Sequence, residues 1–146
     1  MTVLDVGAGS GILSIASALL GARRVVACDV DPVAVEIAGA NLRHAGARVQ
    51  LFNGSADAIR TGSVDLIVAN ISASASIELA AEFLRCLAPG GRCLASGFES
   101  WEAAAVEAAL NRAGAMVSSR VFKGQWILIA AERATGNNRG NALRTE

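Results

Sequence analysis

Short runs of aliphatic residues alternate along the chain with longer segments whose apolar positions recur at helical spacing. The short runs predict strands, because each is bounded by residues that favour turns. Strands are expected at residues 2–6, 25–28, 49–52, 64–70, 92–96, 115–122 and 125–132. Helices are expected at residues 11–21, 31–45, 74–88 and 101–113, with a short helical turn before residue 62.

The order of these elements predicts the fold class. Strands and helices alternate through the first five strands, which is typical of a parallel sheet with helices on both faces. The last two strands follow one another across Lys123-Gly124, a hairpin-type turn. We therefore expect an α/β fold with a Rossmann-like, doubly wound, seven-stranded sheet, mostly parallel with one antiparallel strand near the C-terminus.

Composition within individual segments refines this picture. The run at 64–70 is almost wholly aliphatic and β-branched, which is typical of a central strand buried on both faces. Pro89-Gly90-Gly91 predicts a turn between the helix at 74–88 and the next strand, and Gly97 is expected to end that strand.

The length of 146 residues suits one domain, which we expect to span residues 1–133. Residues 134–146 have little hydrophobic periodicity and are rich in glycine and asparagine. They are therefore expected to form a disordered polar tail.

Charge and cysteine content narrow the function classes. With 13 basic and 13 acidic residues the net charge is zero, so direct binding of nucleic acid is not expected. The apolar stretch at 12–20 is too short to cross a bilayer, so no membrane association is expected. The three cysteines lack metal-ligand spacing and are interpreted as buried free thiols in a reducing cytoplasm, with no metal bound. A monomer is expected, since the predicted apolar faces are buried against the sheet and are not left for a second copy.

Between the first strand and the first helix, glycines occupy alternate positions, Gly7, Gly9 and Gly11. Glycine lets a ligand press against the main chain, and a helix start offers unpaired N–H groups. This pattern suits a polar cofactor at the carboxyl edge of the sheet, and it also suits a tight packing turn. A dinucleotide fingerprint has its third glycine one position later, where this chain has Ile12, so the spacing disfavours a nicotinamide dehydrogenase.

Asp29 ends the second predicted strand, 18 residues after Gly11. A carboxylate at this place can accept hydrogen bonds from both hydroxyls of a ribose. Asp31 precedes Pro32 at the start of the second helix and is interpreted as its N-cap.

The stretch Asp5-Val6-Gly7-Ala8-Gly9-Ser10-Gly11 resembles the first motif of the class I S-adenosylmethionine (SAM) methyltransferases, Asp/Glu-x-Gly-x-Gly-x-Gly. The resemblance implies SAM as cofactor and S-adenosyl-L-homocysteine as product. It implies that Gly7, Ala8, Gly9 and Gly11 meet the methionine part of the cofactor. Asp5 would steady the glycine loop or receive the cofactor's amino group. Asp29, with Val30 beside it, would meet the ribose.

The loop at residues 53–57 approaches the adenine in this family. Many members have an acid directly after the glycine, where this chain has the neutral Ser55. Either Ser55 or Asp57 can serve the adenine amino edge, and the main-chain N–H groups of Ser55 and Ala56 are further donors. Turn formation alone also explains this loop, and the choice between the two side chains stays open.

The stretch Val68-Ala69-Asn70-Ile71 is similar to a signature of the bacterial ribosomal protein methyltransferase family PrmA, which modifies lysine and terminal amines of a large-subunit protein. Many amino-methyltransferases have Asn/Asp-Pro-Pro-Tyr/Phe here instead. The resemblance covers residues 2 to about 132, with further matches at 4–16, 29–35, 87–92, 96–97 and 125–126. It implies that Asn70 is the catalytic residue, orienting an acceptor amine beside the cofactor.

The resemblance implies a SAM-dependent enzyme that transfers a methyl group to an amine nitrogen of a protein substrate, a ribosomal protein. Two alternatives stay open. One is a methyltransferase of the same fold acting on a small molecule or another protein. The other is a SAM-binding core that is inactive without an N-terminal substrate domain, since family members carry such a domain and a linker loop before the first strand.

Overall fold

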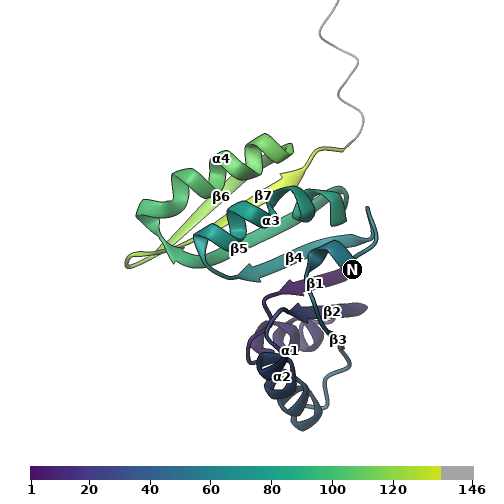
Figure 1. Ribbon diagram of the computed structural model, residues 1–146. Helices are drawn as coiled ribbons and strands as arrows, with labels where there is room; N and C mark the ends of the chain where they lie inside the picture. Colours follow the sequence, from purple (N-terminus) through teal and green to yellow (C-terminus); the bar gives the residue numbers. More distant parts are fainter. Residues whose placement is uncertain (136–146) are drawn as a thin grey trace, which may run out of the picture.

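The computed structural model describes residues 1–135, which form one mixed β-sheet with helices on both faces (Figure 1). The strands are β1 (Thr2–Val6), β2 (Arg24–Asp29), β3 (Gln50–Asn53), β4 (Val64–Asn70), β5 (Leu87–Glu99), β6 (Ala115–Lys123) and β7 (Trp126–Arg133). The α-helices are α1 (Ile12–Leu19), α2 (Pro32–His44), α3 (Ala73–Cys86) and α4 (Ala103–Ala113). Two short 3₁₀ turns are η1 (Ala56–Ala58) and η2 (Ser100–Glu102).

The seven strands lie in the order β3-β2-β1-β4-β5-β7-β6. The pairs among β1 to β5 are parallel, whereas β7 is antiparallel to both β5 and β6. Only β7 therefore runs against the others, which confirms the predicted fold class. The predicted central place of the strand at 64–70 is also confirmed, since β4 is fourth in the sheet.

The strand order reverses between β1 and β4. The chain moves outward from β1 to β2 and β3, and then returns to the other side of β1 with β4. In open α/β sheets the crevice for a ligand lies outside the carboxyl ends of the strands at such a reversal. Asp29 ends β2 and Asn70 ends β4, so both candidate side chains lie at this edge.

The alternation of side chains along β1 separates the two faces of the sheet. Asp5 points toward α1, where the Ser14 hydroxyl donates to its carboxylate. Its neighbours Leu4 and Val6 belong to the same core cluster as Phe83 of α3. Figure 1 accordingly shows α1 and α2 beside β1 to β3, and α3 packed with α4 over the other half of the sheet. The main apolar core therefore lies beneath α3 and α4.

The predicted turn at Pro89-Gly90-Gly91 is wrong, because these residues lie inside β5. α3 ends at Cys86, and the fully buried Leu87 pairs at once with Val64. The register then shifts, so that residues 88–91 form a bulge opposite β4. Proline has no N–H to donate, and a bulge is one of the few places in a sheet that accommodates it.

The expected end of the same strand at Gly97 is also wrong. β5 continues to Glu99, with a second irregularity between Ala95 and Phe98 in its pairing with β7. Gly97 has φ of +97°, which bends the strand at a position that favours glycine. The predicted tail at 134–146 lies, apart from residues 134 and 135, outside the described part of the chain, and the domain boundary stays a prediction. Across residues 1–135, none of the helices has the length and apolar character needed to cross a membrane.

Candidate cofactor and acceptor site

A cavity of about 360 Å³ lies at the carboxyl ends of β1, β2 and β4. The loop after β3 and the first turns of α3 complete its wall. Its lining residues are Val6, Gly7, Asp29, Val30, Gly54, Ser55, Asn70, Ile71, Ser72, Ala75 and Leu79. The cavity therefore occupies the crevice where the strand order reverses, and we treat it as the candidate cofactor cavity.

Glycine is required where the main chain leaves β1. Gly7 has φ of +74°, and a Cβ atom at this position would lie 2.3 Å from Cγ2 of Ile71. The N–H groups of Gly7 and Ala8 both donate to the Cys28 carbonyl, at 2.9 and 3.0 Å, and that of Gly9 donates to the Asp29 carboxylate. These three donors are thus used inside the protein, so the loop offers a ligand close approach to bare main chain rather than free N–H groups.

Asp5 lies behind the glycine loop rather than in the cavity wall. Its side chain is fully buried, and Oδ2 accepts a hydrogen bond of 2.6 Å from the Ser14 hydroxyl. Oδ1 is buried with no hydrogen-bond partner among the described residues. Burial raises the pKa of the Asp5 carboxyl, an effect that the hydrogen bond from Ser14 opposes. Asp5 thus links β1 to α1 and keeps one oxygen free to accept a proton or a hydrogen bond.

Asp29 is held rigidly at the end of β2. Its Oδ2 accepts from the N–H of Gly9 at 2.9 Å and its Oδ1 from the N–H of Asp31 at 3.0 Å. Its carbonyl accepts from Asn53 Nδ2 and from the N–H of Gly54, both at 2.9 Å. Each carboxylate oxygen has a further lone pair, so the group can still accept from a pair of hydroxyls.

The loop after β3 is fixed to α3 by one arginine. The Arg85 guanidinium donates to the carbonyls of Ile59 at 2.7 Å and Ala56 at 2.9 Å, and it forms an ion pair of 2.7 Å with Glu82. Gly54 and Ser55 at the start of this loop line the cavity, whereas Asp57 is not among the lining residues. The contact of either side chain with a base stays a prediction.

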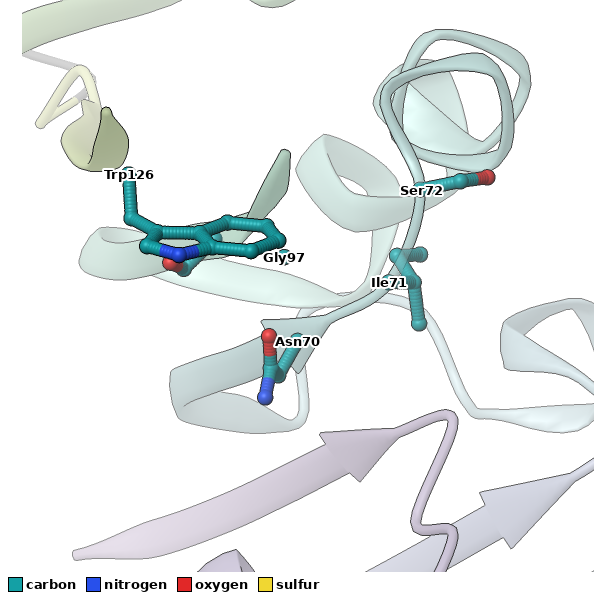
Figure 2. Close-up of a pocket in the computed structure, with 6 residues that line it drawn as sticks. Asn70, Ile71, Ser72, Gly97 and Trp126 are labelled. Carbon is teal, nitrogen blue, oxygen red and sulfur yellow. The ribbon is translucent and has the colours of Figure 1, made fainter. Parts of the chain in front are cut away.

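A second cavity, of about 510 Å³, opens beyond Asn70 (Figure 2). It is lined by Asn70, Ile71, Ser72, Ser96, Gly97 and Trp126. A third and largely apolar cavity of about 280 Å³ extends along the sheet from the same point, lined by Leu13, Val68, Ala69, Asn70, Leu94, Ser96 and Leu128. Asn70 is the one residue that lines all three of these cavities. We call the second the acceptor cavity.

Pairing between β4 and β5 fixes the position of Asn70. Asn70 pairs with Ser96, and the N–H of Ile71 donates to the Ser96 carbonyl at 2.9 Å. The Ser96 hydroxyl in turn donates to the Ile127 carbonyl on β7 at 2.8 Å. β5 holds the end of β4 and is itself held by β7, which suits a side chain that must orient a reacting group.

The residues expected from the sequence fall into two groups. Gly7, Asp29, Val30, Ser55 and Asn70 line the cofactor cavity. Asp5, Ala8, Gly9, Gly11 and Ala56 lie outside its wall, where the hydrogen bonds described above tie several of them to their surroundings.

Sequence reasoning assigned a role to Asn70 alone and missed the other five residues of the acceptor cavity, Ile71, Ser72, Ser96, Gly97 and Trp126. Ser72 carried a usable signal, since it is the N-cap of α3 and its hydroxyl accepts from the N–H of Ala75 at 3.3 Å. Gly97 and Trp126 fall in stretches that match the PrmA family, at 96–97 and 125–126, but their place in the cavity depends on a bulge in β5 and on the insertion of β7 beside it.

Comparison with known proteins gives the family. The profile of "Ribosomal protein L11 methyltransferase (PrmA)" matches residues 1–134. A ribosomal protein L11 methyltransferase of Pelotomaculum thermopropionicum is 44% identical over 132 residues, which are 89% of this chain and 43% of that protein. A namesake from Thermus thermophilus is 37% identical over 132 residues, covering 90% of this chain and 52% of the relative. The chain therefore spans about half the length, or less, of these relatives.

Solved structures agree with this assignment. A ribosomal protein L11 methylase of Lactobacillus delbrueckii subsp. bulgaricus superposes with a TM-score of 0.86 and 32% identity, over 91% of this chain and 70% of that one. A SAM-dependent methyltransferase from Methanosarcina mazei shares the fold, with a TM-score of 0.78 and 15% identity over 91% of this chain and 92% of that one. The chain belongs to the ribosomal protein L11 methyltransferase (PrmA) family.

Proposed function

We propose that this chain is the catalytic domain of a SAM-dependent methyltransferase that modifies an amine nitrogen, a lysine or terminal amine of a ribosomal protein. The observation that carries the proposal is the position of Asn70 between the cofactor cavity and the acceptor cavity. The relatives that the chain matches are named for ribosomal protein L11, and this supports a ribosomal protein as acceptor. We also propose that the enzyme acts in the cytoplasm as a monomer, and its three buried free cysteines support the first of these points.

The residues at the crevice fit SAM. The carboxylate of Asp29 suits the two hydroxyls of a ribose, as argued above. Asp5 is fully buried and lies outside the cavity wall, so its role is to steady the glycine loop through the hydrogen bond from Ser14. Gly7 lines the cavity without a side chain of its own, and the space that its Cβ would fill is taken by Ile71. When bound, SAM supplies a methyl group on a positively charged sulfur, already activated for transfer to a lone pair.

The remaining task of the protein is to place the acceptor, which is an effect of position and orientation. The Asn70 amide oxygen would accept an N–H of the amine and aim its lone pair toward the cofactor cavity. Among residues 1–135, those that line the acceptor cavity are all uncharged, so none of them is a carboxylate that would hold an extra proton on the nitrogen. Partial exclusion of water further favours the neutral amine, which is the form with a free lone pair.

A direct test is methyl transfer from radiolabelled SAM to purified ribosomal protein L11, with Asn70→Ala as the paired variant. Label in L11 that the substitution removes would support the proposal. Label only in small amines or in unrelated proteins would favour a methyltransferase of different acceptor specificity. SAM binding without transfer to any acceptor would favour a cofactor-binding core that needs further chain, a reading that the 43% coverage of a relative also supports.

A further inference from the structure

We propose that Asn41 is a positioning residue for the glycine loop, residues 7–11, and that it acts through the Ser10 carbonyl. Its side-chain Nδ2 donates a hydrogen bond of 2.8 Å to this carbonyl, across a separation of 31 residues in the chain. Asn41 lines none of the three cavities described above. The inference rests on the proposed function, because it concerns how the protein holds the methionine part of SAM.

The glycine loop needs support from outside because of its composition. Gly7, Gly9 and Gly11 have φ of +74°, +53° and +81°, all in the left-handed region. Glycine reaches this region without strain, but it also has the greatest backbone freedom of any residue. A loop of this kind binds a ligand well where neighbouring elements fix its shape beforehand, since ordering it on binding costs affinity.

The contacts that fix the loop from one side come from β2 and α2. The N–H of Gly9 donates to the Asp29 carboxylate at 2.9 Å. Gly11 lies against α2, because a Cβ atom added there would be 3.4 Å from Cβ of the fully buried Ala38. Asn41 follows Ala38 by three residues and so lies beside it on the surface of the helix. α2 therefore contacts the loop twice, by packing at Ala38 and by the hydrogen bond from Asn41.

The hydrogen bond from Asn41 has a direction that substitutions can test. The Ser10 carbonyl can only accept, so its partner must be a donor, and the amide Nδ2 is one. Asn41→Ala removes the donor. Asn41→Asp keeps the size of the side chain but places an ionised carboxylate, which can only accept, against the carbonyl oxygen. The aspartate variant should therefore displace the loop more than the alanine variant.

Asn111 provides a matched control within the same chain. It is exposed in the last turn of α4, as Asn41 is exposed in the last turn of α2. A negative charge near the C-terminus of a helix opposes the helix dipole in both places. α4 packs with α3, on the other half of the sheet from α1 and α2 (Figure 1). Asn111→Asp therefore carries the same general penalty at a distance from the glycine loop.

The experiment compares two ligands, S-adenosyl-L-homocysteine and 5′-deoxy-5′-methylthioadenosine, which keeps the adenosine but lacks the amino acid. Dissociation constants are measured by calorimetry for the wild type, Asn41→Ala, Asn41→Asp and Asn111→Asp, and urea unfolding shows that each protein is folded. We expect S-adenosyl-L-homocysteine to bind roughly threefold more weakly to Asn41→Ala and roughly tenfold more weakly to Asn41→Asp. Methylthioadenosine should lose less than about twofold, because Asp29 holds the ribose independently of Asn41. Asn111→Asp should match the wild type with both ligands.

Two results would overturn the inference. One is unchanged affinity of a folded Asn41→Asp for S-adenosyl-L-homocysteine. The other is an equal loss of affinity for the two ligands, which would assign Asn41 a general structural role instead of a role at the glycine loop. If the wild type failed to bind S-adenosyl-L-homocysteine, the result would count against the proposed function itself.

Discussion

Gly97 and Asn70 are in contact so close that a single added carbon would not fit between them. A Cβ atom at position 97 would lie 2.7 Å from Oδ1 of Asn70, and equally close to the main-chain N and O of Ile71. The bulge in β5 thus places the main chain of Gly97 directly against Asn70, the residue that we propose orients the acceptor amine. The glycine shapes the acceptor cavity without offering any chemical group of its own.

Gly97→Ala is therefore expected to displace Asn70 and to lower methyl transfer at saturating SAM by tenfold or more, on the order of what a small misplacement of a reacting group costs. Gly124→Ala is the control, because Gly124 also has a positive φ, of +59°, with nothing within 4 Å of a Cβ. Both variants should lose about 1–2 kcal/mol of unfolding free energy from strain in the left-handed region. Gly97→Ala should lose more than this, because the main chain of Ile71 must also shift. Equal turnover in the two variants would show that the close contact between Gly97 and Asn70 does not contribute to methyl transfer.

Asn70→Ala should lower turnover about a hundredfold, because the amine loses the group that orients it. SAM affinity should change far less, since Asn70 is one of many residues around the cofactor cavity. Single-turnover rates and calorimetric SAM affinity, measured on the same preparation, separate the two effects. Asn111→Ala on the exposed surface of α4 serves as control. Parallel losses in both quantities would argue against an orienting role.

Arg85→Ala is expected to loosen the loop that carries Ser55. The arginine bonds to the carbonyls of Ile59 and Ala56, and the Ala56 carbonyl also accepts from the Ile59 N–H and from Cys86 Sγ. Loss of the arginine therefore leaves mainly the Ile59 carbonyl unpaired and should cost about 1–2 kcal/mol of unfolding free energy. SAM affinity should also fall. Arg92→Ala is the contrast, because its ion pair with Glu132 is exposed and is worth about 0–1 kcal/mol. Unchanged SAM affinity in Arg85→Ala would mean that the loop keeps its shape without the hydrogen bonds from Arg85.

Asp5 should make stability depend on pH in an unusual direction. Because burial raises its pKa, the folded protein binds this proton more tightly than the unfolded chain. The contribution of Asp5 to the free energy of unfolding therefore falls as pH rises from about 4 through the raised pKa of the folded state. Asp5→Asn removes this titration, so its stability relative to the wild type should increase with pH. Urea unfolding of both proteins between pH 4 and 7.5 gives the difference, and a difference that is constant or falls with pH would refute the prediction.

The sequence predicted those parts of the fold that local signals determine. β1 and β4 have the predicted bounds, 2–6 and 64–70, since each is a mainly aliphatic run that stops at a glycine or a polar residue. Both predicted ends of β5 were wrong, because Pro89 and Gly97 fit inside the strand only where it bulges against particular partner strands. Which strands pair is decided only in the folded sheet, so it cannot be predicted from the local sequence pattern.

The same distinction applies to the site. Gly7, Asp29 and Asn70 were predicted because each follows or ends a strand at one edge, which places them together once the sheet is parallel. Trp126 belongs to a stretch that resembles the PrmA family, but the sequence assigned it no role in the site. It reaches the acceptor cavity only because β7 inserts between β5 and β6.

The central claim, that the crevice holds SAM through Asp29, is tested most directly by calorimetric titration. The chain, Asp29→Ala and Asp31→Ala are each titrated with SAM, S-adenosyl-L-homocysteine and NADH. Asp31→Ala is the matched control, since it removes a carboxylate from the same turn that caps α2 rather than facing the cavity. The account predicts binding of SAM and its product, weakened about tenfold or more by Asp29→Ala and little by Asp31→Ala. Binding of NADH alone, or SAM binding that is indifferent to Asp29, would contradict it.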